Sequence, residues 1–190
     1  MQDRVLLPVL AEFLLYPDPS SVERLASRVE EVSQLNRAVS ERLREFVSFA
    51  RSRSLTELQE LFTRTFDLNP VCSLEVGWGL FGEDYRRGRF LAFVRGQLRE
   101  NGIAESCELP DHLTHLLPLL ARLQPEHARR LGREYVGPAV RKMVVTLETE
   151  RSPFLPVLLS IESVLVSCFG AISDTTPPDI PAGRVLEVLQ

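Results

Sequence analysis

The stretch CELPDHLTH, residues 107–115, is the part of the sequence richest in side chains that could do chemistry. It combines a thiol, two carboxylates and two imidazoles, from Cys107, Glu108, Asp111, His112 and His115. Such groups bind zinc and act in acid–base catalysis. The two histidines, however, are three residues apart rather than four as on a zincin helix, and no second cluster supplies further ligands. The spacing therefore argues against a metal site.

A catalytic use of the same stretch is also disfavoured. Asp111 and His112 are adjacent, so on a helix their side chains would diverge by about 100° instead of forming the hydrogen-bonded pair of a triad. The sequence has no G-x-S-x-G serine, and nothing marks Cys107 as an activated thiol. Two readings remain. Pro110 and Asp111 start a helix with both histidines on its surface, or the polar groups orient a bound peptide beside an apolar cleft.

GWGLFG, residues 77–82, matches the dinucleotide-binding pattern G-x-G-x-x-G. That pattern needs a strand before it and a βαβ unit around it, whereas the flanking segments have helical periodicity. We expect instead that Gly77 and Gly79 allow close helix packing around Trp78, and that Gly82 ends a short helix. A metal- or nucleotide-binding helical enzyme working at 107–115 or 77–82 is the alternative function.

Composition limits the class of protein further. The 190 residues suit one domain, and a net charge of -4 argues against a nucleic-acid partner. The three cysteines, Cys72, Cys107 and Cys168, form no disulfide or metal-binding pattern and suit a reducing compartment. The apolar run 154–170 is short for a membrane span and carries Glu162, which favours a buried core helix. We expect a cytoplasmic protein without membrane insertion.

Helical periodicity runs through almost the whole chain and predicts an all-α, single-domain bundle of about eight or nine helices. Capping boxes at Ser20–Glu23 and Ser54–Glu57 mark two helix starts, and Gly137-Pro138 predicts a break or kink. The domain spans 1–172, followed by a Pro-rich tail at 173–190. The apolar end of that tail could dock into a groove of its own chain or of a second copy, which keeps a homodimer open.

Several stretches, taken in order, resemble one family. They are FLLYPD (13–18), LQELFTRTFDLNP (58–70), Ser73-Leu74, LFGEDYRRG (80–88) and ELPDH (108–112). Together they resemble the delta subunit of respiratory nitrate reductase, the NarJ type of molybdenum-cofactor assembly chaperone within the TorD-like redox-enzyme maturation chaperones. The sequence departs from that pattern at Val71-Cys72, where a basic residue and a histidine are usual, and at Glu75, where an aromatic residue is usual.

The resemblance implies a chaperone without catalytic activity, bound cofactor or metal. Its partner would be the catalytic subunit of a molybdoenzyme, the alpha subunit of nitrate reductase, whose N-terminal leader it would hold during molybdenum-cofactor insertion. The leader would bind a groove at 108–112, with charged His112 tuning the grip near neutral pH. By resemblance, the peptide-binding residues are Leu61, Phe62, Pro70, Glu108, Pro110, Asp111 and His112.

Overall fold

The computed structural model describes residues 2–172, and this part of the chain is all-α. The predicted tail at 173–190 lies outside the described residues. After a short 3-10 turn, Gln2–Val5, the helices are α1 (Leu6–Glu12), α2 (Ser21–Ser33), α3 (Arg37–Arg51), α4 (Leu55–Phe62), α5 (Val76–Phe81), α6 (Arg86–Glu100), α7 (Leu113–Arg122), α8 (Pro125–Leu131), α9 (Gly137–Thr149) and α10 (Leu155–Phe169).

Two π-helical turns continue preceding helices without a break. The turn η2 (Thr63–Asp67) extends α4, and the turn η3 (Gly132–Val136) connects α8 to α9. Counted as continuous helices, residues 2–172 contain nine, in agreement with the prediction. The break predicted at Gly137-Pro138 does not occur: the wider π turn precedes Pro138, and the helix continues through it.

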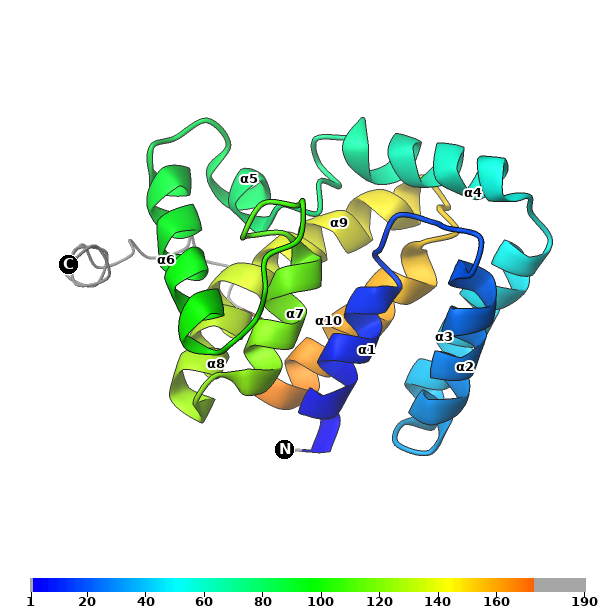
Figure 1. The fold of residues 1–190 in the computed structure, drawn as a ribbon, viewed down its shortest axis with the longest axis horizontal. Helices are drawn as coiled ribbons and strands as arrows, with labels where there is room; N and C mark the ends of the chain where they lie inside the picture. The colour runs from blue at the N-terminus through cyan, green and yellow to red at the C-terminus, as the bar shows by residue number, and fades with distance from the viewer. Residues whose placement is uncertain (1, 173–190) are drawn as a thin grey trace.

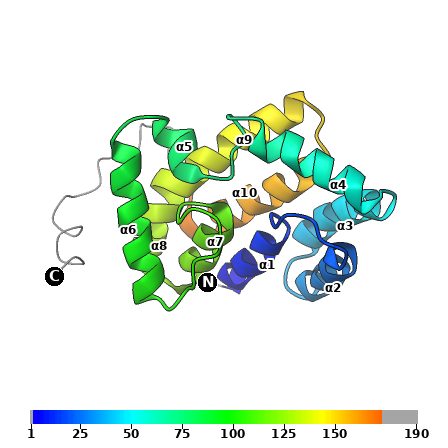
Figure 2. The same cartoon turned by 45° about the horizontal axis from the view of Figure 1, so that its top comes forward.

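The apolar run 154–170 forms the centre of the bundle, as predicted. Its helix, α10, packs against α1, α3, α8 and α9. Figures 1 and 2 show α1 and α10 in the middle, with α2, α3 and α4 on one side and α5, α6, α7 and α8 on the other. Val157, Leu158 and Ile161 are fully buried on α10, so this helix contributes to stability through buried apolar surface. No helix within residues 2–172 is long and apolar enough to cross a membrane.

One non-helical backbone contact connects the segments that lead into α5 and α7. The segment before α5 pairs with the segment before α7 through an isolated antiparallel bridge between Glu75 and His112. The Val76 N–H donates to the Asp111 carbonyl at 3.0 Å, and the Leu113 N–H donates to the Leu74 carbonyl at 2.9 Å. Because both segments lead directly into helices, this pairing sets how α5 and α7 sit relative to each other.

Candidate functional site

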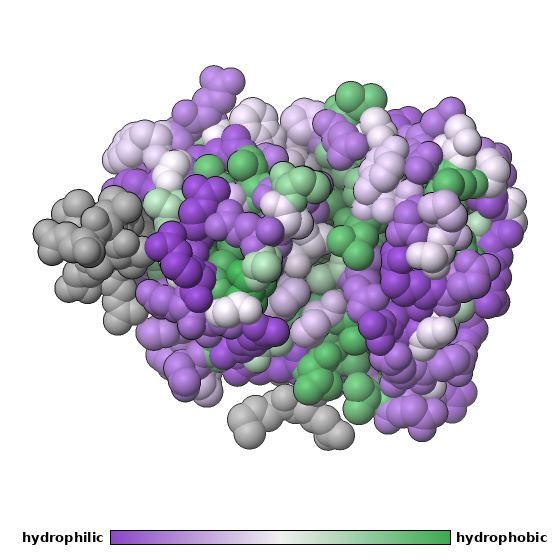
Figure 3. Space-filling model, viewed as in Figure 1, coloured by the Kyte–Doolittle hydropathy of each residue, from purple (hydrophilic) through white to green (hydrophobic). Residues whose placement is uncertain are grey.

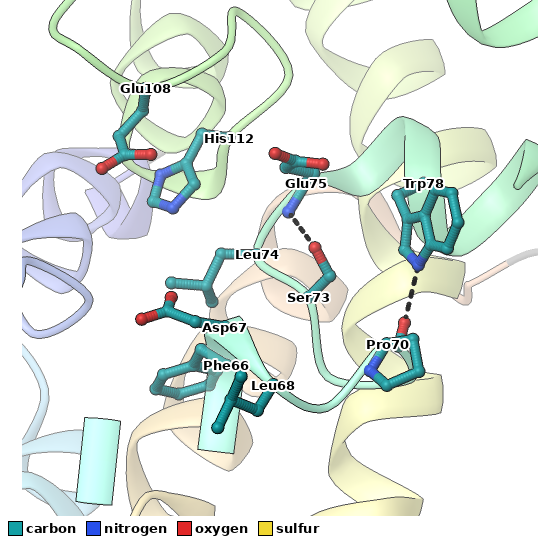
Figure 4. A pocket seen from close by; sticks show the side chains of 10 residues that line it. All are labelled: Phe66, Asp67, Leu68, Pro70, Ser73, Leu74, Glu75, Trp78, Glu108 and His112. Atoms are coloured by element: carbon teal, nitrogen blue, oxygen red, sulfur yellow. Dashed lines mark hydrogen bonds between the residues drawn. The ribbon is translucent and has the colours of Figure 1, made fainter. Parts of the chain in front are cut away.

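An open pocket of about 510 Å³ lies where these two paired segments meet the end of η2. Figure 4 shows its lining from close by. The residues come from the α4–α5 connection, from α5 itself and from the loop before α7: Phe66, Asp67, Leu68, Pro70, Ser73, Leu74, Glu75, Trp78, Glu108 and His112. The pocket therefore combines apolar side chains with carboxylates at the junction of three chain segments.

The LNP turn after η2 is held by local hydrogen bonds, so its side of the pocket is well defined. The Asn69 side-chain oxygen accepts from the Val71 N–H at 3.1 Å, and its carbonyl accepts from the Cys72 N–H at 3.0 Å. Asn at such a position stabilises a turn because its short side chain reaches its own backbone. The Trp78 indole N–H donates to the Pro70 carbonyl at 3.0 Å and ties this turn to α5.

Asp111 is buried next to the pocket and bonds to the start of α5. Its side chain is fully buried, and one carboxylate oxygen accepts from the Gly77 N–H at 2.8 Å, at the start of α5. The other oxygen, Oδ1, has no hydrogen-bond partner. Burial, with a smaller contribution from Glu75, raises the pKa of Asp111. Asp111 thus caps α5 from outside the pocket lining, and it joins the 108–112 loop to α5.

His112 lines the pocket but acts locally as the N-cap of α7. Its Nδ1 accepts from the Thr114 N–H at 3.3 Å and lies 2.6 Å from the Thr114 hydroxyl. The ring is 8% exposed, and burial, aided by the nearby His115, lowers the pKa of His112 to about 4. The imidazole is therefore neutral at pH 7. The expectation that its charge tunes binding near neutral pH is not supported.

One interpretation of the sequence put both histidines on a helix surface. In the structure they do not lie there. His115 is 4% exposed, and its ring holds the preceding loop against α7. Its Nε2 lies 3.0 Å from both the Ser106 N–H and the Ser106 hydroxyl, and its Nδ1 lies 2.9 Å from the Leu109 carbonyl oxygen. The His115 imidazole thus shapes the 106–112 loop, whereas the His112 imidazole caps α7.

The seven predicted peptide-binding residues fall into three groups. Pro70, Glu108 and His112 line the pocket, whereas Pro110 and Asp111 are buried next to it. Leu61 and Phe62 are outside the lining: Leu61 packs against the core, and Phe62 belongs to an aromatic cluster with Tyr16, Phe66 and Phe154.

The apolar side of the pocket is supplied by residues that the sequence reasoning did not select. They are Phe66, Leu68, Leu74 and Trp78, accompanied by the carboxylates of Asp67 and Glu75. Leu68 is 75% exposed, so its apolar side chain is accessible to a ligand at the pocket. Figure 3 shows apolar surface in a band through the middle of this face, between polar surface over α6 and over α2. The signal that could have identified Phe66, Asp67 and Leu68 was the TFDLNP stretch, which is part of the resemblance to the family.

GWGLFG has a structural explanation in α5. A Cβ on Gly77 would lie 2.6 Å from the Asp111 carboxylate and 3.0 Å from the Phe90 ring, so glycine is required there. Gly82, with φ of +57°, ends the helix as predicted. Gly79 has its nearest such neighbour at 3.9 Å, so close packing does not demand it. Across residues 2–172, no group of three or more His, Cys, Asp and Glu side chains is placed to hold a metal ion.

Fold and pocket together define an all-helical protein with an open, partly apolar and partly acidic binding pocket. The family model described as nitrate reductase delta subunit matches residues 32–160, more than half of the chain and all ten residues that line the pocket. The protein belongs to the nitrate reductase delta subunit family. Membership supports a role as a chaperone in nitrate reductase maturation rather than as a catalyst. No curated protein sequence matches the chain.

Proposed function

We propose that this protein binds the N-terminal leader of a molybdoenzyme catalytic subunit, the alpha subunit of respiratory nitrate reductase, in the pocket between η2, α5 and the 108–112 loop. It holds that subunit competent for molybdenum-cofactor insertion and acts in the cytoplasm. The observation that carries this proposal is the open pocket with Leu68 exposed at its side, within the part of the chain that matches the family.

The shape and chemistry of the pocket suit a short amphipathic peptide. A helical leader would place apolar side chains at helical spacing against Leu68, Leu74 and Trp78, in the helix-in-groove mode. Burial of the exposed Leu68 side chain would then supply part of the binding free energy. The acidic side chains around the pocket would orient the peptide and raise its association rate more than its affinity.

Chaperoning of this kind requires no chemical step by the protein. Binding shifts the population of catalytic subunits toward a form whose cofactor site is still open. The leader stays covered until assembly proceeds.

Isothermal titration calorimetry tests the proposal with the N-terminal peptide of the nitrate reductase alpha subunit from the same organism. The informative variant is Leu68→Ala, because the side chain is 75% exposed and its loss should barely change stability. Removing most of its apolar contact should weaken peptide binding about tenfold. Leu35→Ala, at a leucine that is 45% exposed between α2 and α3, is the matched control and should bind like the wild type.

Two results would reject the proposal. One is the absence of binding by the wild-type protein at peptide concentrations up to the millimolar range, about the limit of meaningful affinity. The other is equal affinity of the Leu68→Ala and Leu35→Ala variants, which would place the peptide elsewhere.

A further inference from the structure

The pocket is acidic as well as apolar. Its lining contains three carboxylates, from Asp67, Glu75 and Glu108, and it contains no lysine or arginine. Figure 4 shows the three carboxylates around the space occupied by the His112 and Leu74 side chains. A pocket with such lining prefers a cationic occupant, because each unpaired carboxylate contributes favourable Coulomb energy to a positive charge near it.

Glu75 already has its counterion. The Arg87 guanidinium donates to the Glu75 carboxylate at 2.5 Å, and the same guanidinium lies over the Trp78 ring at 5.3 Å from its centre. Arg87 is thereby held by two pocket residues at once. The charge of Glu75 is largely compensated, and its carboxylate serves to position α5.

Asp67 and Glu108 are different, since among residues 2–172 neither has a cation within ion-pair distance. Asp67 is the last residue of η2, and Glu108 belongs to the loop before α7. Both are exposed, so a ligand can reach them. The group between them, His112, is neutral at pH 7 because burial lowers its pKa to about 4. Two negative charges therefore face the pocket without compensation.

The walls between these charges are apolar. Phe66 is 2% exposed and Leu74 is 3% exposed, and both contribute to the lining. A metal ion does not suit this arrangement, since the described residues hold no group of three or more ligands at metal-binding distances. A side chain with a long aliphatic stem and a charged tip does suit it, because the stem can lie on apolar surface while the tip stays in a polar environment.

We propose that the pocket contains a subsite for a single lysine or arginine side chain of the bound leader. The aliphatic stem packs against Phe66 and Leu74, and the charged tip lies between the carboxylates of Asp67 and Glu108. This assignment rests on the proposed leader binding. It adds a defined position of the leader's basic residue relative to the pocket. A leader whose basic residue falls at another helical position loses either the subsite or its apolar contacts, which makes Asp67 and Glu108 determinants of client specificity.

The test combines peptide and protein variants in a double-mutant cycle. Each lysine or arginine of the alpha-subunit peptide is replaced in turn by glutamine, and each peptide is titrated into the wild type and into Asp67→Asn/Glu108→Gln. One replacement should weaken binding to the wild type about fivefold and binding to the double variant less than twofold. Both protein changes are at exposed side chains without ion pairs in the described structure, so the fold should persist.

Glu60→Gln is the matched control, because Glu60 is exposed on α4 and does not line the pocket. In this variant the sensitive peptide position should still cost about fivefold. The subsite is refuted if every peptide replacement has the same effect on the double variant as on the wild type, even though the peptide binds. Loss of all peptide binding by the wild type would instead overturn the proposed function, so the two failures are distinguishable.

Discussion

Replacing Asp111 with alanine should destabilise the protein by about 2 kcal/mol, although the residue belongs to the stretch expected to contact the client. The carboxylate is fully buried and accepts from the Gly77 N–H at 2.8 Å. Alanine leaves that donor without a partner, at a cost of about 1–3 kcal/mol. The loss of a helix cap falls within the same range. Removal of a buried carboxylate with an unpaired Oδ1 returns part of this cost.

Thermal and urea unfolding followed by circular dichroism measure this change at pH 7. For a chain of this length, 2 kcal/mol corresponds to a decrease in Tm of about 4–8 °C. Asp111→Asn is the matched control: its side-chain carbonyl can still accept from Gly77, and its stability should stay within about 1 kcal/mol of the wild type.

The pH dependence of this difference has a definite sign. Burial raises the pKa of Asp111 in the folded protein. The protonated form therefore contributes stability that is fully present below the unfolded-state pKa of about 3.9 and is lost as the pH rises through the folded-state value. The stability gap between wild type and Asp111→Ala should accordingly be larger at pH 4.5 than at pH 7.5.

Two outcomes would refute the role of Asp111 as a cap. One is an alanine variant as stable as the wild type at pH 7. The other is an asparagine variant that folds normally but loses affinity for the leader peptide, which would mean direct contact between Asp111 and the client.

Two further predictions concern glycine and histidine. Gly132→Ala should cost about 2–3 kcal/mol, because the new methyl group would overlap the Phe169 ring, whereas Gly79→Ala, with its nearest neighbour at 3.9 Å, should be neutral or stabilising by up to about 1 kcal/mol; equal Tm values would contradict this. Because the pKa of His112 is lowered to about 4, its contribution to stability is present above about pH 6.5 and is lost as the pH falls toward 4. Urea unfolding should show a loss of up to about 3 kcal/mol between pH 7.5 and 4.5 that a folded His112→Gln variant lacks.

The helical architecture could be predicted because the information that determines it is local. The run 154–170, which is apolar almost throughout but short for a membrane span, identified α10 as a core helix, since a helix that is hydrophobic on all sides must be buried to be stable. The capping box at Ser54 is confirmed: its hydroxyl accepts from the Glu57 N–H at 3.3 Å, and the Glu57 carboxylate accepts from the Ser54 N–H at 2.8 Å. Both partners lie within one turn, so neighbouring structure had little influence.

The capping box at Ser20–Glu23 is wrong for an equally local reason. Asp18 accepts from both the Ser20 N–H, at 2.7 Å, and the Ser20 hydroxyl, at 2.6 Å, and the Ser20 side chain caps no helix N–H. The Asp18 carboxylate lies only two residues away, so it takes the Ser20 N–H that the Glu23 side chain would have accepted, and it engages the Ser20 hydroxyl that would have accepted from the Glu23 N–H. The Ser-x-x-Glu pattern was present, but the competing acceptor Asp18 lies just before it in the sequence.

The π turn at η2 explains why a regular helical period does not predict the position of Leu68 beside the pocket. Continuing the regular period through Leu58, Leu61, Phe62 and Phe66 treats the segment as one helix with one inward face. The i→i+5 turn adds a residue to that face between Thr63 and Leu68, so Leu68 ends 75% exposed beside the pocket while Phe62 stays in the core. Sequence periodicity carries no sign of this extra residue.

The roles of the residues in 108–112 could not be predicted from the sequence, because they depend on non-local contacts. Whether Glu108, Asp111 or His112 faces the client depends on the pairing of its backbone with residues 74–76, far away in the sequence. That pairing turns Asp111 toward the Gly77 N–H and leaves Glu108 at the pocket. By residue type alone, Asp111 and Glu108 are equivalent carboxylates. The backbone bridge between Glu75 and His112 makes Asp111 a structural cap and leaves Glu108 as a free charge. A change at Glu108 should therefore affect client binding directly, whereas a change at Asp111 should affect it through the position of α5.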